Sequence, residues 1–237
     1  MSDPFQPRLI ANMSGVSVML AMPLNRDMPW QTAASLLGTQ ALMIERGIPF
    51  EIRFCHGCSL VEIARTRLAH EFLEGDKTRL FWVDSDIQWR PEDFLRMLAL
   101  STRMEVVAAA YPAKVDAPTF LLQHREDMTF NDFGCVAIEG IGMGFMVVGR
   151  EVIQALAERA PKLKFPQRSD PMAHIFRCDA DGEKFRGEDM AFCADVRALG
   201  FDVHVDPTIR LGHIGAKTYT GGLMDAMELG GMKAAAE

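Results

Sequence analysis

Apolar segments of strand length alternate with segments of helical spacing along this chain, and this order restricts the fold more than any other feature. The expected strands lie at residues 16–22, 50–54, 79–86, 105–111 and 201–206, and those at 16–22 and 105–111 read as buried. The expected helices lie at residues 29–47, 59–75, 91–100, 150–159 and 188–199. Alternating strands and helices predict an α/β/α sandwich, Rossmann-like in its layers, around a mainly parallel sheet.

The length of 237 residues suits one domain with a full hydrophobic core. We expect that domain at residues 16–220, after an N-terminal extension at 1–15 and before a tail at 221–237. Residues 161–187 are rich in proline, aspartate and charge, so we expect an irregular, mobile loop there.

Composition and charge exclude some classes of protein. The net charge of −7 argues against sequence-independent binding of nucleic acid, although it leaves room for a local basic cleft. The N-terminus lacks the pattern of a signal peptide, and no apolar stretch reaches membrane-spanning length. The five cysteines are an odd number, which favours reduced thiols. These observations predict a cytoplasmic protein without a membrane span.

The segment FWVDSDIQWRPEDF, residues 81–94, contains two carboxylates at the end of an expected strand. Because side chains alternate along a strand, Asp84 and Asp86 start on the same side of the backbone. At the carboxyl end of a central strand they can share one hard divalent cation, or divide between a cation and a ribose. The structural alternative is an acidic turn that caps the next helix.

Two further segments carry polar groups of matching chemistry. Glu188 and Asp189 open an expected helix, and His213 follows a strand in RLGHIG. Two carboxylates and a histidine suit Mn²⁺ or Mg²⁺ with phosphate oxygens, and a separate acid is free to act as a base. Each feature also has a structural explanation, because helix dipoles favour acids in the first turn and loop histidines often bond to carbonyls.

The order of these motifs resembles that of the GT-A fold nucleotide-sugar glycosyltransferases. It is similar in particular to the short, single-domain, family-2-like enzymes of phage and bacterial genomes, which would place a phage-encoded chain in the host cytoplasm. The resemblance covers roughly residues 16–220 and is carried by VSVMLAMP, EIARTRLAHEFL, LFWVDSDIQWRPEDF, VVAAAYPAK, GMGFMVVGREV and GEDMAFCADVRALGFDVHVDPTIRLGHIG.

The resemblance implies a donor site built on the acidic strand end. Asp84 would contact the ribose or bridge to the metal, and Asp86 and His213 would ligate Mn²⁺ (or Mg²⁺). Arg65 matches a position that reaches the nucleotide diphosphate, although Thr66 stands where relatives often carry asparagine. The remaining donor-binding residues implied are Pro23, Asn25, Ser85 and Lys114.

On the acceptor side, the implied residues are Tyr111, Gly142, Met143 and Gly144. The glycines of GIGMG lack the spacing of a dinucleotide-binding loop, so we interpret them as a close approach of the backbone under the sugar or acceptor.

The implied reaction moves a sugar from a nucleoside-diphosphate sugar, with a UDP-sugar expected, to an acceptor hydroxyl with inversion. Asp189 is the preferred base and Glu188 would position hydroxyls, with the reverse assignment left open. The leading acceptor is a hydroxymethylated pyrimidine in phage DNA, and a polysaccharide or lipid-linked precursor is the alternative. A basic lip for DNA would comprise Lys162, Lys164, Arg168 and Arg177. A sugar nucleotidyltransferase and a non-catalytic nucleotide-sugar-binding module are competing functions.

Overall fold

The computed structural model describes residues 11–117, 119–126, 129–165 and 170–228. Its central sheet has eight strands in the order β2-β1-β3-β8-β5-β13-β7-β6. Their bounds are β1 Val18–Leu24, β2 Phe50–His56, β3 Arg79–Val83, β5 Val106–Ala108, β6 Leu122–His124, β7 Val136–Ile141, β8 Phe145–Gly149 and β13 Val203–Val205. Only β8 and β7 run against the other strands of this sheet. The prediction of a single α/β domain around a mainly parallel sheet is confirmed.

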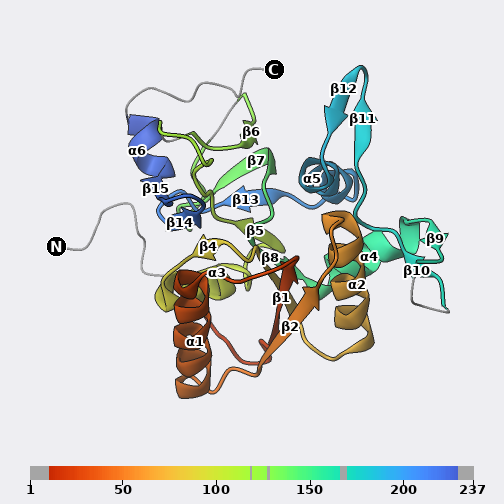
Figure 1. Ribbon diagram of the computed structural model, residues 1–237, viewed down its shortest axis with the longest axis horizontal. Coiled ribbons are helices and arrows are strands. Elements are labelled where there is room, and N and C mark those ends of the chain that lie inside the picture. The colour runs from red at the N-terminus through yellow and green to blue at the C-terminus, as the bar shows by residue number, and fades with distance from the viewer. Residues whose placement is uncertain (1–10, 118, 127–128, 166–169, 229–237) are drawn as a thin grey trace.

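Helices cover both faces of the sheet, as Figure 1 shows. Helices α1 (Trp30–Glu45) and α3 (Pro91–Leu100) pack on one face, where Phe94 stacks on Phe81 of β3. Helices α2 (Val61–Glu74), α4 (Arg150–Arg159) and α5 (Glu188–Ala198) pack on the other. Apolar residues at successive positions of β1 and β3 therefore serve two cores, which explains why these strands are apolar throughout.

A second sheet joins the acidic strand end to the C-terminal part of the domain. It contains β4 (Ile87–Gln88), β14 (Arg210–Ile214) and β15 (Thr218–Gly222) in the order β15-β14-β4. His213 lies opposite Ile87 in the antiparallel register, one residue beyond Asp86. Residues far apart in the sequence thus meet beside the end of β3.

Residues 161–187 differ from the expected irregular loop. They contain two short antiparallel pairs, β9 (Lys162–Leu163) with β10 (Met172–Ala173) and β11 (Asp179–Asp181) with β12 (Lys184–Arg186). The second pair projects from the body in Figure 1. An ion pair between Arg186 and Asp179, at 2.7 Å, links its two strands. The mobility of this segment stays a prediction, and residues 166–169 lie outside the described part.

The predicted termini of the domain are described only in part. Residues 1–10 of the expected extension and 229–237 of the expected tail lie outside the described residues. Helix α6 (Leu223–Glu228) directly follows β15, whose last residues pass the expected boundary at 220.

A buried hydroxyl fixes helix α1 to Trp89, the residue that follows β4. The Ser35 hydroxyl donates to the Trp89 carbonyl at 2.7 Å and accepts from the Trp89 amide at 3.1 Å. Ser35→Ala should therefore lower the free energy of unfolding by about 1–3 kcal/mol, because two buried backbone groups lose their partner. Urea unfolding would measure this change, and a loss below about 0.3 kcal/mol, as expected of an ordinary surface substitution, would contradict it.

Candidate active site

A cavity of about 360 Å³ lies where β1 and β3 end. The chain passes from β1 to β2 on one side and then crosses to β3 on the other, so this is a switch point in strand order, where ligands of α/β proteins bind. The lining residues are Pro23, Asn25, Cys58, Ser59, Val61, Arg65, Asp84, Ser85, Asp86, Tyr111, Glu188 and His213. Most of the side chains expected in a donor site therefore converge on one cavity.

Arg65 is a buried cation aimed at the acids of the cavity. Its side chain is only 3% exposed, and Nη2 donates to Asp84 Oδ1 at 2.9 Å. Its Nε lies 3.6 Å from Glu188 Oε1, and the guanidinium lies over the Trp82 ring. Nε and Nη1 are buried without a hydrogen-bond partner among the described residues. A buried guanidinium with unused donors is suited to an anionic ligand.

Asp86 is paired with two side chains that converge on one of its oxygens. Lys114 Nζ lies 2.6 Å from Asp86 Oδ2, and His213 Nε2 lies 3.5 Å from the same oxygen. Burial opposes ionisation of Asp86, but the interactions with His213 and Lys114 prevail and hold its pKa below the ordinary value. Asp86 is therefore a charged carboxylate at neutral pH.

The His213 ring is held by the backbone. Its Nδ1 lies 2.9 Å from the Pro112 carbonyl oxygen. Because a carbonyl only accepts, Nδ1 carries the proton and donates it, which leaves Nε2 facing Asp86. A metal-ligating histidine is typically oriented in this way by its second nitrogen. The structural explanation considered from sequence and the proposed ligand role are thus compatible.

The metal site predicted at Asp84, Asp86 and His213 is not assembled by the side chains as they stand. Within the described ranges, no three His, Cys, Asp or Glu side chains are grouped closely enough to hold a metal ion. Asp84 is turned to Arg65, while Asp86 is taken by Lys114. The ligand set therefore stays a prediction.

The two acids at the start of α5 differ in position: Glu188 faces the cavity, and Asp189 bonds to the backbone of the helix. Glu188 lines the cavity, and burial raises its pKa despite the nearby Arg65. Asp189 is not among the lining residues, and its Oδ1 accepts the Met190 amide at 2.7 Å. Burial also raises the pKa of Asp189, although the bond from Met190 opposes it. Both carboxyls are thus more basic than in water.

Gly142 and Gly144 leave room for the side chain of Tyr111. A Cβ at Gly144 would lie 2.7 Å from Tyr111 Cε1 and 2.8 Å from Asp84 Oδ2, and one at Gly142 would collide with the Tyr111 hydroxyl. Burial, together with Asp84, raises the pKa of Tyr111. The close approach that we expected beneath a ligand is therefore made by Tyr111 and Asp84. Met143, assigned to the acceptor side, is buried in the core.

Three lining residues were not predicted from sequence. Cys58 and Ser59 come from the connection between β2 and α2, and Val61 is the first residue of α2, the helix that carries Arg65. Their position between a strand end and Arg65 was the signal available. Lys114 is not among the lining residues, but its ammonium pairs with Asp86, which lines the cavity.

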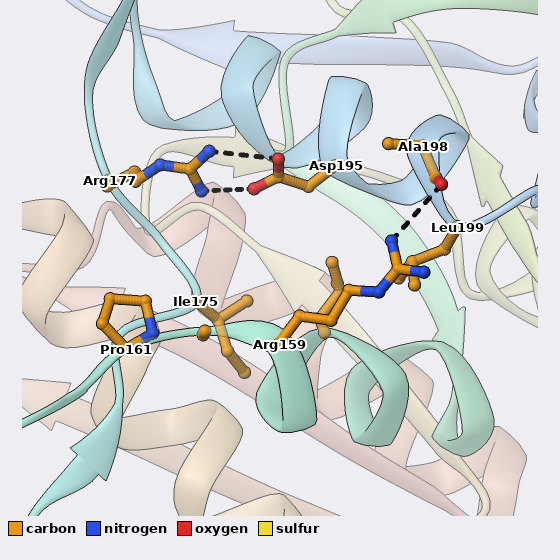
Figure 2. A pocket seen from close by; sticks show the side chains of 9 residues that line it. Arg159, Pro161, Ile175, Arg177, Asp195, Ala198 and Leu199 are labelled. Atoms are coloured by element: carbon orange, nitrogen blue, oxygen red, sulfur yellow. Dashed lines mark hydrogen bonds and ion pairs between the residues drawn. The ribbon is translucent and has the colours of Figure 1, made fainter.

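A second cavity, of about 330 Å³, lies between α4 and α5 (Figure 2). Arg177 pairs with Asp195 there, and Arg159 donates to the Ala198 carbonyl at 3.4 Å. None of the residues that we predicted for the donor or acceptor lines it, apart from Arg177 of the expected basic lip. The cation of that arginine is already paired.

Comparison with known proteins places the fold. No protein-family model and no curated protein matches the sequence. The structure is similar to that of A197 from STIV, with a TM-score of 0.57 and 16% identity, over 88% of this chain and 91% of that one. It is also similar to GalNAc-T7, crystallised with UDP, GalNAc and Mn²⁺, with a TM-score of 0.53 and 8% identity over 87% of this chain and 45% of that one.

The fold is GT-A. This agrees with the sequence prediction, and the sheet places the end of β1 and the acidic residues that follow β3 at the cavity. Among the described helices none is both long and apolar enough to cross a bilayer.

Proposed function

We propose that this chain is a metal-dependent glycosyltransferase that takes its sugar from a nucleoside-diphosphate sugar, with UDP as the nucleotide. One observation carries the proposal: Asp84, Asp86 and His213 meet Arg65 and Glu188 at one cavity on a GT-A fold. A similar fold in GalNAc-T7 was crystallised with UDP and Mn²⁺, which supports the same class of ligand here.

The donor set fits a divalent cation in its chemistry. Asp86 supplies a charged carboxylate and His213 an oriented ring nitrogen, a mixed oxygen and nitrogen set that suits Mn²⁺. When bound, the cation would neutralise charge on the leaving diphosphate. Asp84 would face the ribose or bridge to the cation, and Arg65 would donate its unused N–H groups to a phosphate oxygen. Pro23, Asn25 and Ser85 would hold the nucleoside.

The acid pair supplies the base in this scheme. The acceptor oxygen bonds to the anomeric carbon, its proton passes to Asp189, and the bond from that carbon to the diphosphate oxygen breaks with its electron pair on the diphosphate. We assign the base to Asp189 because Glu188 is engaged with Arg65, and an acid paired with a cation is the weaker base. Attack from the side opposite the leaving group gives inversion.

For the acceptor we keep a hydroxymethylated pyrimidine in DNA as the first substrate to test, with a polysaccharide or lipid-linked hydroxyl as the second. The predicted basic lip is weaker than its sequence implied. Arg177 is paired with Asp195 and lies 3.2 Å from Asp179, while Lys162 and Lys164 are exposed. Arg168 lies outside the described residues.

Hydrolysis of a panel of UDP-, GDP- and dTDP-sugars, with Mn²⁺ and with EDTA, tests the proposed function. We expect Mn²⁺-dependent release of the nucleoside diphosphate from one donor, because water can act slowly in place of the acceptor hydroxyl. Formation of a nucleotide sugar from a nucleoside triphosphate and a sugar phosphate would instead identify a nucleotidyltransferase. Binding of a donor without turnover, with or without acceptors, would identify a binding module.

A further inference from the structure

Lys114 is held on the carboxylate that we propose as a metal ligand. Its ammonium lies 2.6 Å from Asp86 Oδ2, the same oxygen that His213 Nε2 approaches to 3.5 Å. The Lys114 ammonium and the His213 ring therefore approach the same oxygen of Asp86, where we propose that a metal ion binds.

Contacts with neighbouring residues hold Lys114 in its position. The loop that carries it is bound to β14 through the Pro112 carbonyl and His213. The Lys114 stem lies against Gly215, where an added Cβ would be 3.1 Å from Cδ of the lysine and 3.2 Å from the Tyr219 ring. The lysine is thus laid along a glycine toward Asp86 and is not simply a solvated side chain.

Carboxylates outnumber cations around the cavity. The cavity and the start of α5 present four carboxylates: Asp84, Asp86, Glu188 and Asp189. Arg65 and Lys114 supply two positive charges against them. A nucleoside diphosphate would meet a net negative site, so its binding requires added positive charge near Asp86.

We propose that Lys114 is an exchangeable counter-ion: its ammonium neutralises Asp86 in the absence of a divalent cation and transfers to the donor diphosphate when the cation takes that carboxylate. This inference rests on the proposed function. A lysine suits the role because its ammonium is a point charge on a flexible stem, and the side chain is 39% exposed. Lys114 would therefore oppose binding of the metal alone and favour binding of the metal with nucleotide.

Lys114→Met tests the proposal because it predicts two changes of opposite sign. The affinity for Mn²⁺ alone, measured from the electron paramagnetic resonance signal of free Mn²⁺, should rise about twofold to fivefold as the competing ion pair is lost. The affinity for UDP at saturating Mn²⁺, measured by calorimetry, should fall about tenfold or more as a charge-assisted bond to the diphosphate is lost. Inorganic pyrophosphate should show the same fall, since the lysine contacts the diphosphate and not the base.

Lys217→Met is the matched control. Lys217 pairs with Asp116 at 2.6 Å across the same loop and hairpin, so its removal takes away the same charge without touching Asp86. It should leave both affinities within about twofold of wild type. A fall or no change in Mn²⁺ affinity of Lys114→Met, in a wild type that binds UDP with Mn²⁺, would overturn the exchange while leaving the proposed function intact. A wild type that binds neither UDP nor pyrophosphate with Mn²⁺ would overturn the proposed function itself.

Discussion

Replacing Asp189 with asparagine should lower the rate of sugar transfer by about a hundredfold to ten-thousandfold, the usual contribution of a general base. Asparagine keeps the shape of the side chain and can still accept the Met190 amide through its oxygen, so the start of α5 should be preserved. Donor affinity should change little, because Asp189 does not line the cavity. Steady-state transfer and calorimetric binding of the donor measure the two effects separately.

Glu188→Gln is the matched comparison for the base. Glu188 lies in the cavity against Arg65, so its loss should chiefly weaken substrate binding, with a smaller effect on transfer at saturation. If Glu188→Gln is inactive while Asp189→Asn transfers at nearly the wild-type rate, the roles are reversed. If both variants stay active, the pair is a charged helix start and the inverting mechanism is wrong.

Asp86→Ala should abolish Mn²⁺-dependent binding of the nucleoside diphosphate while leaving the fold intact. The substitution removes a proposed ligand at the edge of the cavity, and it releases Lys114 and His213 from the carboxylate that they share. Calorimetry of UDP with Mn²⁺ measures the loss, and circular dichroism checks the fold. Asp116→Ala is the control, since that exposed aspartate also pairs with a lysine at 2.6 Å. Unchanged Mn²⁺-dependent binding in Asp86→Ala would contradict the ligand assignment.

The sequence was sufficient for the fold because the apolar strands serve two cores. The strand ends that place Pro23, Asp84 and Tyr111 could be located from apolar runs that stop at a proline or an acid. The expected strand at residues 79–86 was too long: β3 ends at Val83, and Asp84 and Asp86 follow it in a turn, where both line the cavity with Glu188 and His213. The location of the strand ends needs only the direction of a parallel sheet, whereas the meeting of Glu188 and His213 with them was implied by the family resemblance.

The pairing of charges could not be predicted in the same way. Whether Asp86 is free for a metal ion or paired with Lys114 depends on how the loop after β5 lies against β14, a contact between residues 101 positions apart in sequence. The two short pairs of strands in residues 161–187 were missed because each strand has only two or three residues, too few for a periodic pattern. For Gly142 and Gly144 the sequence indicates a close approach but not which atoms approach, and the nearest side chains are those of Tyr111 and Asp84.

A crystal grown with UDP and Mn²⁺ tests the central claim most directly, since anomalous scattering locates manganese without reference to any assumed site. We predict a manganese peak within coordination distance of Asp86 and His213, with the UDP diphosphate on the metal and Lys114 moved from Asp86 to a phosphate oxygen. Clear density for UDP in the cavity between α4 and α5 would contradict the account, as would a manganese ion bound away from Asp86.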